Sequence, residues 1–388
     1  MLSSSERTIV HMDLDSFFVS VECLKNPRLH GLPLLVGGSS DRAVVAACSY
    51  EARKFGIRSA MPMKFAKRLC PHAVIIGGDM EHYSKFSELV TEVIASEVPV
   101  YEKSSIDEFY IDLTGMDRFY GCQTFTDGLR KKIMKESGLP ISYGMSVNKL
   151  VSKVATDEAK PNGQLSIQRG YEKDFLAPLP VEKIPMVGQQ TASLLRRMGV
   201  ETVKTLSDIP GSYLQNLLGK NGIELWRRSN GIDDSPVIPY HHQKSISTEN
   251  TFQQDTIDID FLLAQLVRMT ETIGFELRRQ SKLTGCISVK IRYADFNTVN
   301  RQVRIAYTAS DRVILSNVKM LFEKLYDRRL LVRLVGVRFT HLVPGNYQIS
   351  LFDETNEMIR LYQAMDGIRN RFGTALISTA RTVDLPEK

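Results

Sequence analysis

Apolar and polar positions recur with two different periods over the first 167 residues. Short apolar or alternating runs are typical of strands, and longer stretches with apolar residues three and four apart are typical of helices. The strand-like runs cover 8–13, 32–38, 43–49, a hairpin at 101–114, and 141–147. The helix-like stretches cover 50–56, 63–69, 83–96, 123–136 and 148–159. This mixture predicts an α/β and α+β fold.

The pattern changes twice further along the chain. From Pro178 onward it consists of short helices and turns, centred on 184–200. Residues 235–244 contain two prolines and show no periodicity, which is typical of a linker. The chain is therefore expected to contain more than one domain.

Residues 245–343 follow the order strand, helix, two hairpin strands, helix, strand, which is the split-βαβ arrangement. In the hairpin, Lys290 and Arg292 alternate with Val289 and Ile291. One face of the sheet should pack on helices, and the other should present cations suited to phosphates. The candidate phosphate contacts of this domain are Ser245, Lys290, Arg292, Arg333 and Arg338.

The composition is that of an ordinary globular protein with a mildly basic balance of charge. The 388 residues allow two to four domains, and the net charge is +6. Residues 245–343 carry 15 Lys and Arg against 10 Asp and Glu, so this segment holds most of the excess. A mildly basic surface is compatible with a polyanionic partner, although it is also common on solvated domains.

The cysteines, the N-terminal sequence and the lengths of the apolar runs indicate the cellular compartment of the protein. Five cysteines are widely spaced and form no CxxC motif, which favours free thiols in a reducing compartment over a disulfide framework or a zinc site. The N-terminus is too polar for a signal peptide, and no apolar run approaches the length of a membrane span. A cytoplasmic protein without a membrane partner is expected.

Three acids form the strongest chemical signal. Asp107 and Glu108 lie side by side at the start of a strand-like run, and Asp13 ends another. At a hairpin tip the pleat can break, so neighbouring acids can point to one place. Three carboxylates would form a hard oxygen site that suits Mg²⁺ rather than zinc. The alternative is that Asp107 and Glu108 are ordinary exposed turn residues.

Several blocks of sequence resemble the Y-family DNA polymerases of the DNA polymerase IV type. These are MDLDSFF (12–18), SYEARKFGIRSAMP (49–62), SSIDE (104–108), KPNG (160–163), GQQTASLL (188–195) and KSISTENTF (244–252). They occur in the family's order, and the resemblance covers about residues 6–345. The first four blocks, in register, are far more specific than any single one.

The resemblance implies a right-hand polymerase with a ferredoxin-like palm, small fingers, a helical thumb with a helix-hairpin-helix, and a split-βαβ little finger domain. The expected bounds are 1–20 and 80–167 for the palm, 21–79 for the fingers, 168–234 for the thumb, 235–244 for the linker, 245–343 for the little finger and 344–388 for the tail.

The resemblance also implies roles for residues of the catalytic centre. Asp13 and Asp107 match the acids that bridge two Mg²⁺ ions, and Glu108 matches the acid beside the primer 3′-oxygen. The Leu14 carbonyl matches a backbone metal ligand.

Four more residues match the nucleotide site of the family. Tyr50, Arg53 and Lys160 match the residues that hold the incoming triphosphate. Phe18 matches the steric gate, a ring that excludes a ribonucleotide 2′-hydroxyl, whereas Phe17 is expected in the core.

Two further motifs match partner-binding segments of the family. Gly188 matches the helix-hairpin-helix that offers backbone N–H groups to DNA, although Met186 stands where members usually carry Gly. QISLFD (348–353) resembles the peptide that docks on the bacterial sliding clamp, through Gln348, Leu351 and Phe352. Alternatively, Leu351 and Phe352 cap a following helix, because 358–372 has helical spacing.

The function expected from these residues is template-directed, Mg²⁺-dependent DNA synthesis from deoxynucleoside triphosphates on primer-template DNA. The resemblance implies that AVVAACS (43–49) covers the nascent base pair, and its small side chains would cover it loosely, which predicts low fidelity and lesion bypass. No second acidic cluster indicates a proofreading exonuclease. A monomer is expected. The alternatives are a palm-type nucleotidyl cyclase and a non-catalytic DNA-binding scaffold.

Overall fold

The structure is a computed structural model that describes residues 7–116, 121–240, 242–326, 329–345, 356–373, 376–377 and 379–380. The chain divides into two compact units, Met1–His241 and His242–Lys388. This division falls inside the segment that the sequence identifies as a linker. None of the helices in the described ranges has both the length and the apolar character needed to cross a bilayer.

The central element of the first unit is a five-stranded sheet in the order β5-β6-β1-β7-β8. Its middle strand, β1, runs antiparallel to both neighbours. The strands are β1 (Ile9–Leu14), β5 (Tyr101–Lys103), β6 (Glu108–Asp112), β7 (Ile141–Ser146) and β8 (Gln164–Ser166). The helices of this layer are α4 (Met80–Glu97), α6 (Cys122–Ser137) and α7 (Lys149–Ala159).

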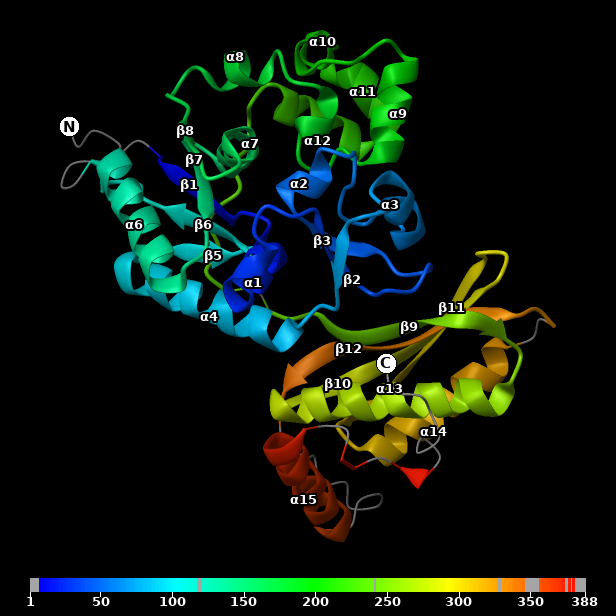
Figure 1. The fold of residues 1–388 in the computed structure, drawn as a ribbon. Coiled ribbons are helices and arrows are strands. Elements are labelled where there is room, and N and C mark those ends of the chain that lie inside the picture. Colours follow the sequence, from blue (N-terminus) through cyan, green and yellow to red (C-terminus); the bar gives the residue numbers. More distant parts are fainter. Residues whose placement is uncertain are drawn as a thin grey trace. The chain divides into compact units, whose positions relative to one another are not determined.

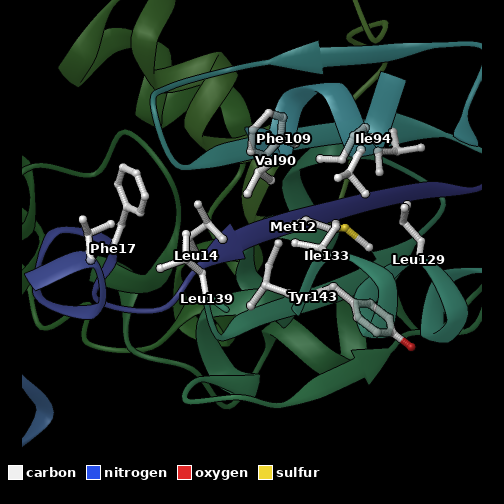
Figure 2. Packing of buried hydrophobic residues seen from close by; sticks show 14 of the residues in the cluster. Met12, Leu14, Phe17, Val90, Ile94, Phe109, Leu129, Ile133, Leu139 and Tyr143 are labelled. Atoms are coloured by element: carbon white, nitrogen blue, oxygen red, sulfur yellow. The ribbon is translucent and has the colours of Figure 1, made fainter. Parts of the chain in front are cut away.

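Both faces of β1 are covered, so each residue of the strand is buried. Because side chains alternate along a strand, Val10, Met12 and Leu14 share one face. They join a core cluster with residues of α4 and α6, and His11 and Asp13 face the opposite way, toward α7. Figure 2 shows the first of these packing layers, with Met12, Val90, Ile94, Phe109, Leu129, Ile133 and Tyr143 labelled.

Local side chains define where two of these helices begin. The Asp79 carboxylate accepts a hydrogen bond from the His82 N–H at the start of α4. The Asn148 side chain accepts one from the Val151 N–H at the start of α7. Capping of this kind typically contributes about 1 kcal/mol per helix. The caps therefore agree with the apolar periodicity that predicts the same helices.

A smaller three-stranded sheet, in the order β3-β2-β4, comes between β1 and α4 in the sequence. Its strands are β2 (Leu34–Gly37), β3 (Val45–Cys48) and β4 (Val74–Ile76). The β2–β3 pair is antiparallel. The accompanying helices are α1 (Phe17–Lys25), the 3-10 helix η1 (Pro27–Leu29), α2 (Tyr50–Arg53) and α3 (Met63–Leu69).

A group of short helices follows β8 and packs around a core that it shares with α7. The buried side chains include Leu195, Leu206, Leu214 and Leu225. The elements are α8 (Glu172–Leu176), η2 (Val181–Lys183), α9 (Gln189–Arg197), α10 (Val203–Asp208), α11 (Gly211–Leu218) and α12 (Lys220–Ser229). The change of pattern after residue 177 thus corresponds to a change from sheet to helices.

The predicted linker is attached at its start to the five-stranded sheet. Val237 is buried against Ile9 and Tyr110. The Ile238 N–H donates to the Glu102 carboxylate at 2.7 Å, and Lys149 pairs with the same carboxylate. Proline content alone did not predict this anchoring, because it depends on a sheet edge formed by distant residues.

The second unit has the predicted order of elements. The strands are β9 (Ser245–Thr256), β10 (Lys282–Tyr293), β11 (Thr298–Thr308) and β12 (Val332–Pro344). The helices are α13 (Ile259–Arg279), α14 (Asp311–Leu325) and α15 (Asn356–Phe372). The sheet order is β11-β10-β12-β9, with all neighbours antiparallel, and α13 and α14 cover one face (Figure 1).

Helix α15 is tied to this unit by a buried cation. The Arg278 guanidinium pairs with Asp311 and with Asp366 of α15, each at 2.6 Å. The Tyr362 ring lies beneath the same guanidinium. The helical spacing of 358–372 therefore corresponds to a helix that packs on the domain through charges as well as apolar contacts.

A glycine determines how closely α7 packs on the sheet. A Cβ at Gly144 of β7 would lie 2.2 Å from the Ser152 carbonyl oxygen and 2.5 Å from the Thr156 nitrogen. We expect Gly144→Ala to lower the free energy of unfolding by at least about 2 kcal/mol, because helix backbone must move. Urea denaturation followed by circular dichroism measures this.

The matched control is Gly128→Ala on the exposed face of α6, where a Cβ would meet no atom within 4 Å. Because Gly is a poor helix former, this change should raise the free energy of unfolding by up to about 1 kcal/mol. Equal effects of the two substitutions would contradict the close packing of α7 on β7.

Candidate active site

Strand pairing brings two of the predicted acids together. Asp13 near the end of β1 pairs directly with Glu108 at the start of β6. One oxygen of each carboxylate and a ring nitrogen of His11 all lie within 4.8 Å of one another. These three side chains share the face of the sheet that α7 covers. The arrangement is the metal-binding candidate within the part of the chain that the structure describes.

Asp107 occupies the turn before β6 rather than the paired position. Its carbonyl accepts a hydrogen bond from the Leu14 N–H at 3.0 Å, and its carboxylate accepts one from the Ser105 hydroxyl at 2.6 Å. The Ser105 oxygen also accepts from the Glu108 N–H at 3.1 Å. This turn therefore separates Asp107 from the regular alternation of β6, which begins at Glu108.

Two lysines from α7 and its C-terminus contact the acids. Lys160 pairs with Asp13 at 2.6 Å, and Lys153 pairs with Glu108 at 2.5 Å. The side chains of these four residues are 7 to 23% exposed. The charged groups of both ion pairs are therefore partly shielded from solvent, where electrostatic interactions are stronger than in water.

Burial dominates the ionisation of Asp13. It raises the pKa of this carboxyl from 3.8 to about 7, although the Lys160 ammonium acts in the opposite direction. Glu108 and Asp107 raise the same pKa further through their negative charges. A carboxylate of this kind gains from any additional cation placed beside it.

Asp15 connects the elements around the site, and the sequence analysis did not single it out. Its side chain accepts hydrogen bonds from the Tyr50 hydroxyl at 3.2 Å, the Ser142 hydroxyl at 2.8 Å and the Asn162 N–H at 2.8 Å. The residue is 2% exposed. The second acid of MDLDSFF was the available signal, but its partners are distant in sequence.

Tyr50 and Arg53 lie on the one-turn helix α2. The Arg53 guanidinium lies over the Tyr50 ring, 4.9 Å from its centroid. The buried Arg53 Nε has no hydrogen-bond partner among the described residues. An unpaired donor on a charged group is costly unless a ligand accepts from it.

Phe18 is held by ring stacking. Its ring stacks on Tyr83 at a centroid distance of 4.2 Å and an interplanar angle of 13°. The Tyr83 hydroxyl in turn donates to Glu22 at 2.8 Å. Phe17 is 3% exposed and belongs to the core, as predicted. The two neighbouring phenylalanines thus have different environments, and only Phe18 is partly accessible.

Gly188 precedes α9, and Met186 lies two residues earlier in a left-handed conformation. The φ of Met186 is 73°, and the residue is 85% exposed. The Gly188 N–H donates to the Met186 carbonyl at 3.1 Å. Position 186 therefore has the backbone conformation that favours glycine, which fits the family pattern from which this chain departs.

Most of the candidate DNA contacts in the second unit share one face of the sheet. The register places Lys290 and Arg292 of β10, Arg338 of β12 and Ser245 of β9 on the face opposite the apolar residues of β10. Arg338 donates to the Ser245 hydroxyl at 3.3 Å, and Lys290 pairs with Glu249.

Arg333 is the exception among these five residues. It occupies a register shift between Val332 and Leu334, so it does not follow the alternation of β12. Its guanidinium lies over the Phe296 ring at 4.6 Å. The clamp-binding candidates Gln348, Leu351 and Phe352 lie outside the described residues.

Comparison with known proteins adds an independent result. Residues 12–157 match the impB/mucB/samB family, residues 243–351 match its C-terminal domain, and residues 182–233 match the thumb domain of DNA polymerase-iota. The chain is 37% identical to a DNA polymerase IV of Dehalococcoides mccartyi over 387 residues, covering 99% of each. The chain belongs to the Y-family DNA polymerases, of the DNA polymerase IV type.

Other DNA polymerase IV relatives are similarly close. A DNA polymerase IV of Desulfatibacillum aliphaticivorans is 35% identical over 386 residues, with 98% of each chain covered. A solved Y-family DNA polymerase chimera has the same fold, with a TM-score of 0.77 at 24% identity, covering 87% of this chain and 100% of that one. Membership of the DNA polymerase IV family makes the chain a DNA-directed DNA polymerase and confirms the multidomain polymerase fold. Divalent metal use follows from the family.

The environment of Asp13 gives a prediction about pH. The folded-state pKa lies above the unfolded value of 3.8, so the folded chain binds more protons between that value and about 7. This group therefore makes the metal-free chain less stable as pH rises through that window. We expect ¹³C NMR of labelled aspartates to show one carboxyl that titrates near pH 7.

The substitution Lys160→Met should raise that titration midpoint further, because the cation that favours the carboxylate is removed. Lys25→Met, which removes an exposed partner of Asp79, serves as the control. An Asp13 midpoint below pH 5 in both the wild type and Lys160→Met would contradict the assignment.

Proposed function

We propose that this polymerase carries out low-fidelity translesion DNA synthesis by two-metal nucleotidyl transfer, without a proofreading exonuclease. The observation that carries this proposal is the pairing of Asp13 with Glu108 on a buried sheet face beside the Lys160 ammonium. Its substrates are primer-template DNA and deoxynucleoside triphosphates.

The donor set at this site suits Mg²⁺. It offers the carboxylates of Asp13, Asp107 and Glu108 and the Leu14 carbonyl, all hard oxygen ligands. The raised pKa of Asp13 supports the binding of Mg²⁺ at this site. The Lys160 ammonium alone does not offset the effect of burial on this carboxylate, so a bound cation would stabilise its charge further. Two Mg²⁺ ions bound here would stabilise both the attacking primer oxygen and the leaving pyrophosphate oxygen.

The chain's own residues then bind and orient the triphosphate. Arg53 offers a planar set of donors, including the buried Nε that has no partner among the described residues. Lys160 supplies a point charge and would exchange its contact with Asp13 for one with phosphate. Tyr50 is fixed for the same purpose by its hydrogen bond to Asp15.

Two separate DNA contacts are proposed, Gly188 in the first unit and the cationic sheet face of the second unit. On that face Lys290, Arg292, Arg338 and Ser245 share one side of three strands. Cations on a flat sheet suit phosphate contacts, which position DNA without reading its sequence. Arg333 would contact DNA from the register shift of β12.

Low fidelity is inferred from the strand at 43–49, whose side chains are small. Val44 is 52% exposed, and the side chains of Ala46 and Ala47 are too small to pack tightly against a base pair. When the nascent base pair is loosely covered, its shape contributes less to the difference in binding free energy between a correct and an incorrect nucleotide. The enzyme therefore discriminates weakly between them.

The remaining proposals concern domains and partners. We propose the domain bounds predicted above, and a sliding clamp that binds residues 348–353. A monomeric, cytoplasmic enzyme is proposed, and the five buried, free cysteines support a reducing compartment. The cyclase and scaffold alternatives are not favoured, because the chain belongs to a DNA polymerase family over its full length.

The central prediction concerns the paired acids. We expect Asp13→Asn and Glu108→Ala each to reduce primer extension with Mg²⁺ at least about 10³-fold, a loss of about 4 kcal/mol of transition-state stabilisation. Gel-based extension of a labelled primer on a templated duplex measures this rate.

The control variant is Asp112→Asn, which changes an acid at the other end of β6 and should retain extension within about twofold. Normal extension by Glu108→Ala would refute the assigned site. Product formation from triphosphate without any template would favour the cyclase instead.

A second prediction tests the steric gate. Phe18→Ala should raise the incorporation of ribonucleotides relative to deoxyribonucleotides by at least about tenfold, because about 1.4 kcal/mol of discrimination comes from the collision of the ring with a 2′-hydroxyl. Single-nucleotide incorporation kinetics measure the ratio.

The control is Tyr83→Phe, which keeps the stacked ring and removes only the hydroxyl that bonds Glu22. This variant should discriminate between the sugars as the wild type does. An unchanged ratio in Phe18→Ala would place the gate elsewhere.

A further inference from the structure

The turn between β10 and β11 holds a phenylalanine in an unusual setting. This turn protrudes from the four-stranded sheet of the second unit (Figure 1). Phe296 in the turn is 64% exposed, although its side chain is large and apolar. Its backbone has a φ of 64°, which lies in the left-handed region that bulky residues rarely adopt.

The hydrogen bonds of the turn do not require this side chain. The Tyr293 N–H donates to the Asn297 carbonyl at 3.0 Å, and the Phe296 N–H donates to the Tyr293 carbonyl at 3.0 Å. The Asp295 side chain accepts from the Asn297 N–H at 2.9 Å. Position 296 would therefore suit glycine or asparagine, which tolerate a left-handed backbone. A bulky ring kept at a strained and exposed position points to a ligand that contacts it.

Arg333 makes the ring part of a flat platform. Its guanidinium lies over the Phe296 ring, 4.6 Å from the centroid. Because Phe296 is still 64% exposed beside this contact, much of the ring remains open to solvent. Aromatic rings and guanidinium planes are the surfaces on which unpaired nucleobases stack in proteins that bind single strands.

Positive charge beside the platform favours a nucleic acid over an apolar partner. Arg292 lies opposite Thr298 in the β10–β11 ladder, and Thr298 follows Phe296 by two residues. The Arg292 Nε donates to the Thr298 hydroxyl at 2.8 Å, which holds this guanidinium near the turn. Arg292 and Arg333 thus offer charge to the phosphates that flank a stacked base.

We propose that Phe296 and Arg333 form a stacking site for an unpaired nucleobase of single-stranded DNA. The inference goes beyond the phosphate contacts proposed for the sheet face, because it assigns contact with a base. It rests on those proposed contacts only for the class of partner. Every base has a flat face, so the site binds without sequence preference.

The test measures the binding of the full chain to two single strands of equal length. One is a fluorescein-labelled oligo-dT of about 16 nucleotides, and the other has the same phosphates but carries abasic sugars throughout. Fluorescence anisotropy without metal ion or triphosphate gives both affinities. The wild type should bind the base-bearing strand at least about fivefold more tightly, because only that strand can stack.

The variant Phe296→Gly should remove this preference, so that the two affinities agree within about twofold. Glycine suits the backbone at position 296, so this variant should fold and should melt at or above the wild-type temperature. The variant Phe296→Trp keeps a flat ring and should retain the preference. Because Trp226 is the single tryptophan of the chain, the added indole would also report stacking through quenching by oligo-dT.

The matched control is Phe372→Ala at the end of α15. Phe372 is 59% exposed, and the Arg371 guanidinium lies 5.2 Å from its ring centroid, but the residue belongs to a helix. This variant should keep the wild-type preference for the base-bearing strand. An equal loss of the preference in Phe372→Ala and Phe296→Gly would overturn the assignment to the turn.

The outcomes separate this inference from the catalytic function. Equal affinity of the wild type for both strands, or an unchanged preference in Phe296→Gly, would overturn the stacking site. A lower melting temperature of Phe296→Gly with an unchanged preference would give the ring a structural role instead. Primer extension enters neither measurement, so normal extension by Glu108→Ala would refute the catalytic site without changing the result on strand binding.

Discussion

The antiparallel pairing of β1 with β6 is the constraint on which the proposed catalytic centre depends. Directly opposed residues of such a pair point to the same face, and this register opposes Asp13 and Glu108. A shift by one residue would turn one of these acids toward the core formed with α4 and α6. The apolar residues of β1 prevent that shift, because Val10, Met12 and Leu14 would lose their buried contacts.

Helix α7 accounts for how the acids on this sheet face can be largely buried in a stable domain. Helix α7 covers this face closely, since Gly144 allows its backbone to approach β7. It also supplies Lys153 and, at its end, Lys160, which pair with the acids. Packing, charge balance and ligand binding thus involve one helix and one strand.

Asp15 links this centre to the residues proposed to bind the triphosphate. It joins α2, β7 and the turn after α7 through one carboxylate. Because Tyr50 and Asn162 share this partner, a displacement of either would change the hydrogen bonds of the other. The network is buried, where a lost partner leaves a costly unsatisfied group.

The sequence by itself determined the elements, their order and the acids. Periodicity identified the strands and helices because a buried face must repeat every two or every 3.6 residues. Motifs predicted Asp13, Asp107 and Glu108 as metal ligands, because metal chemistry limits the residue types that can serve it, and these roles stay predictions. The family comparison then confirmed the fold and the enzyme class.

Only the tertiary structure decided which side chains meet. It placed His11 in the group with Asp13 and Glu108, assigned Asp107 to a turn beside it, and moved Arg333 out of the row of cations. It also made Asp15 a shared hydrogen-bond acceptor. These outcomes depend on strand register, a bulge and helix contact between distant segments, and no local pattern of residues carries that information.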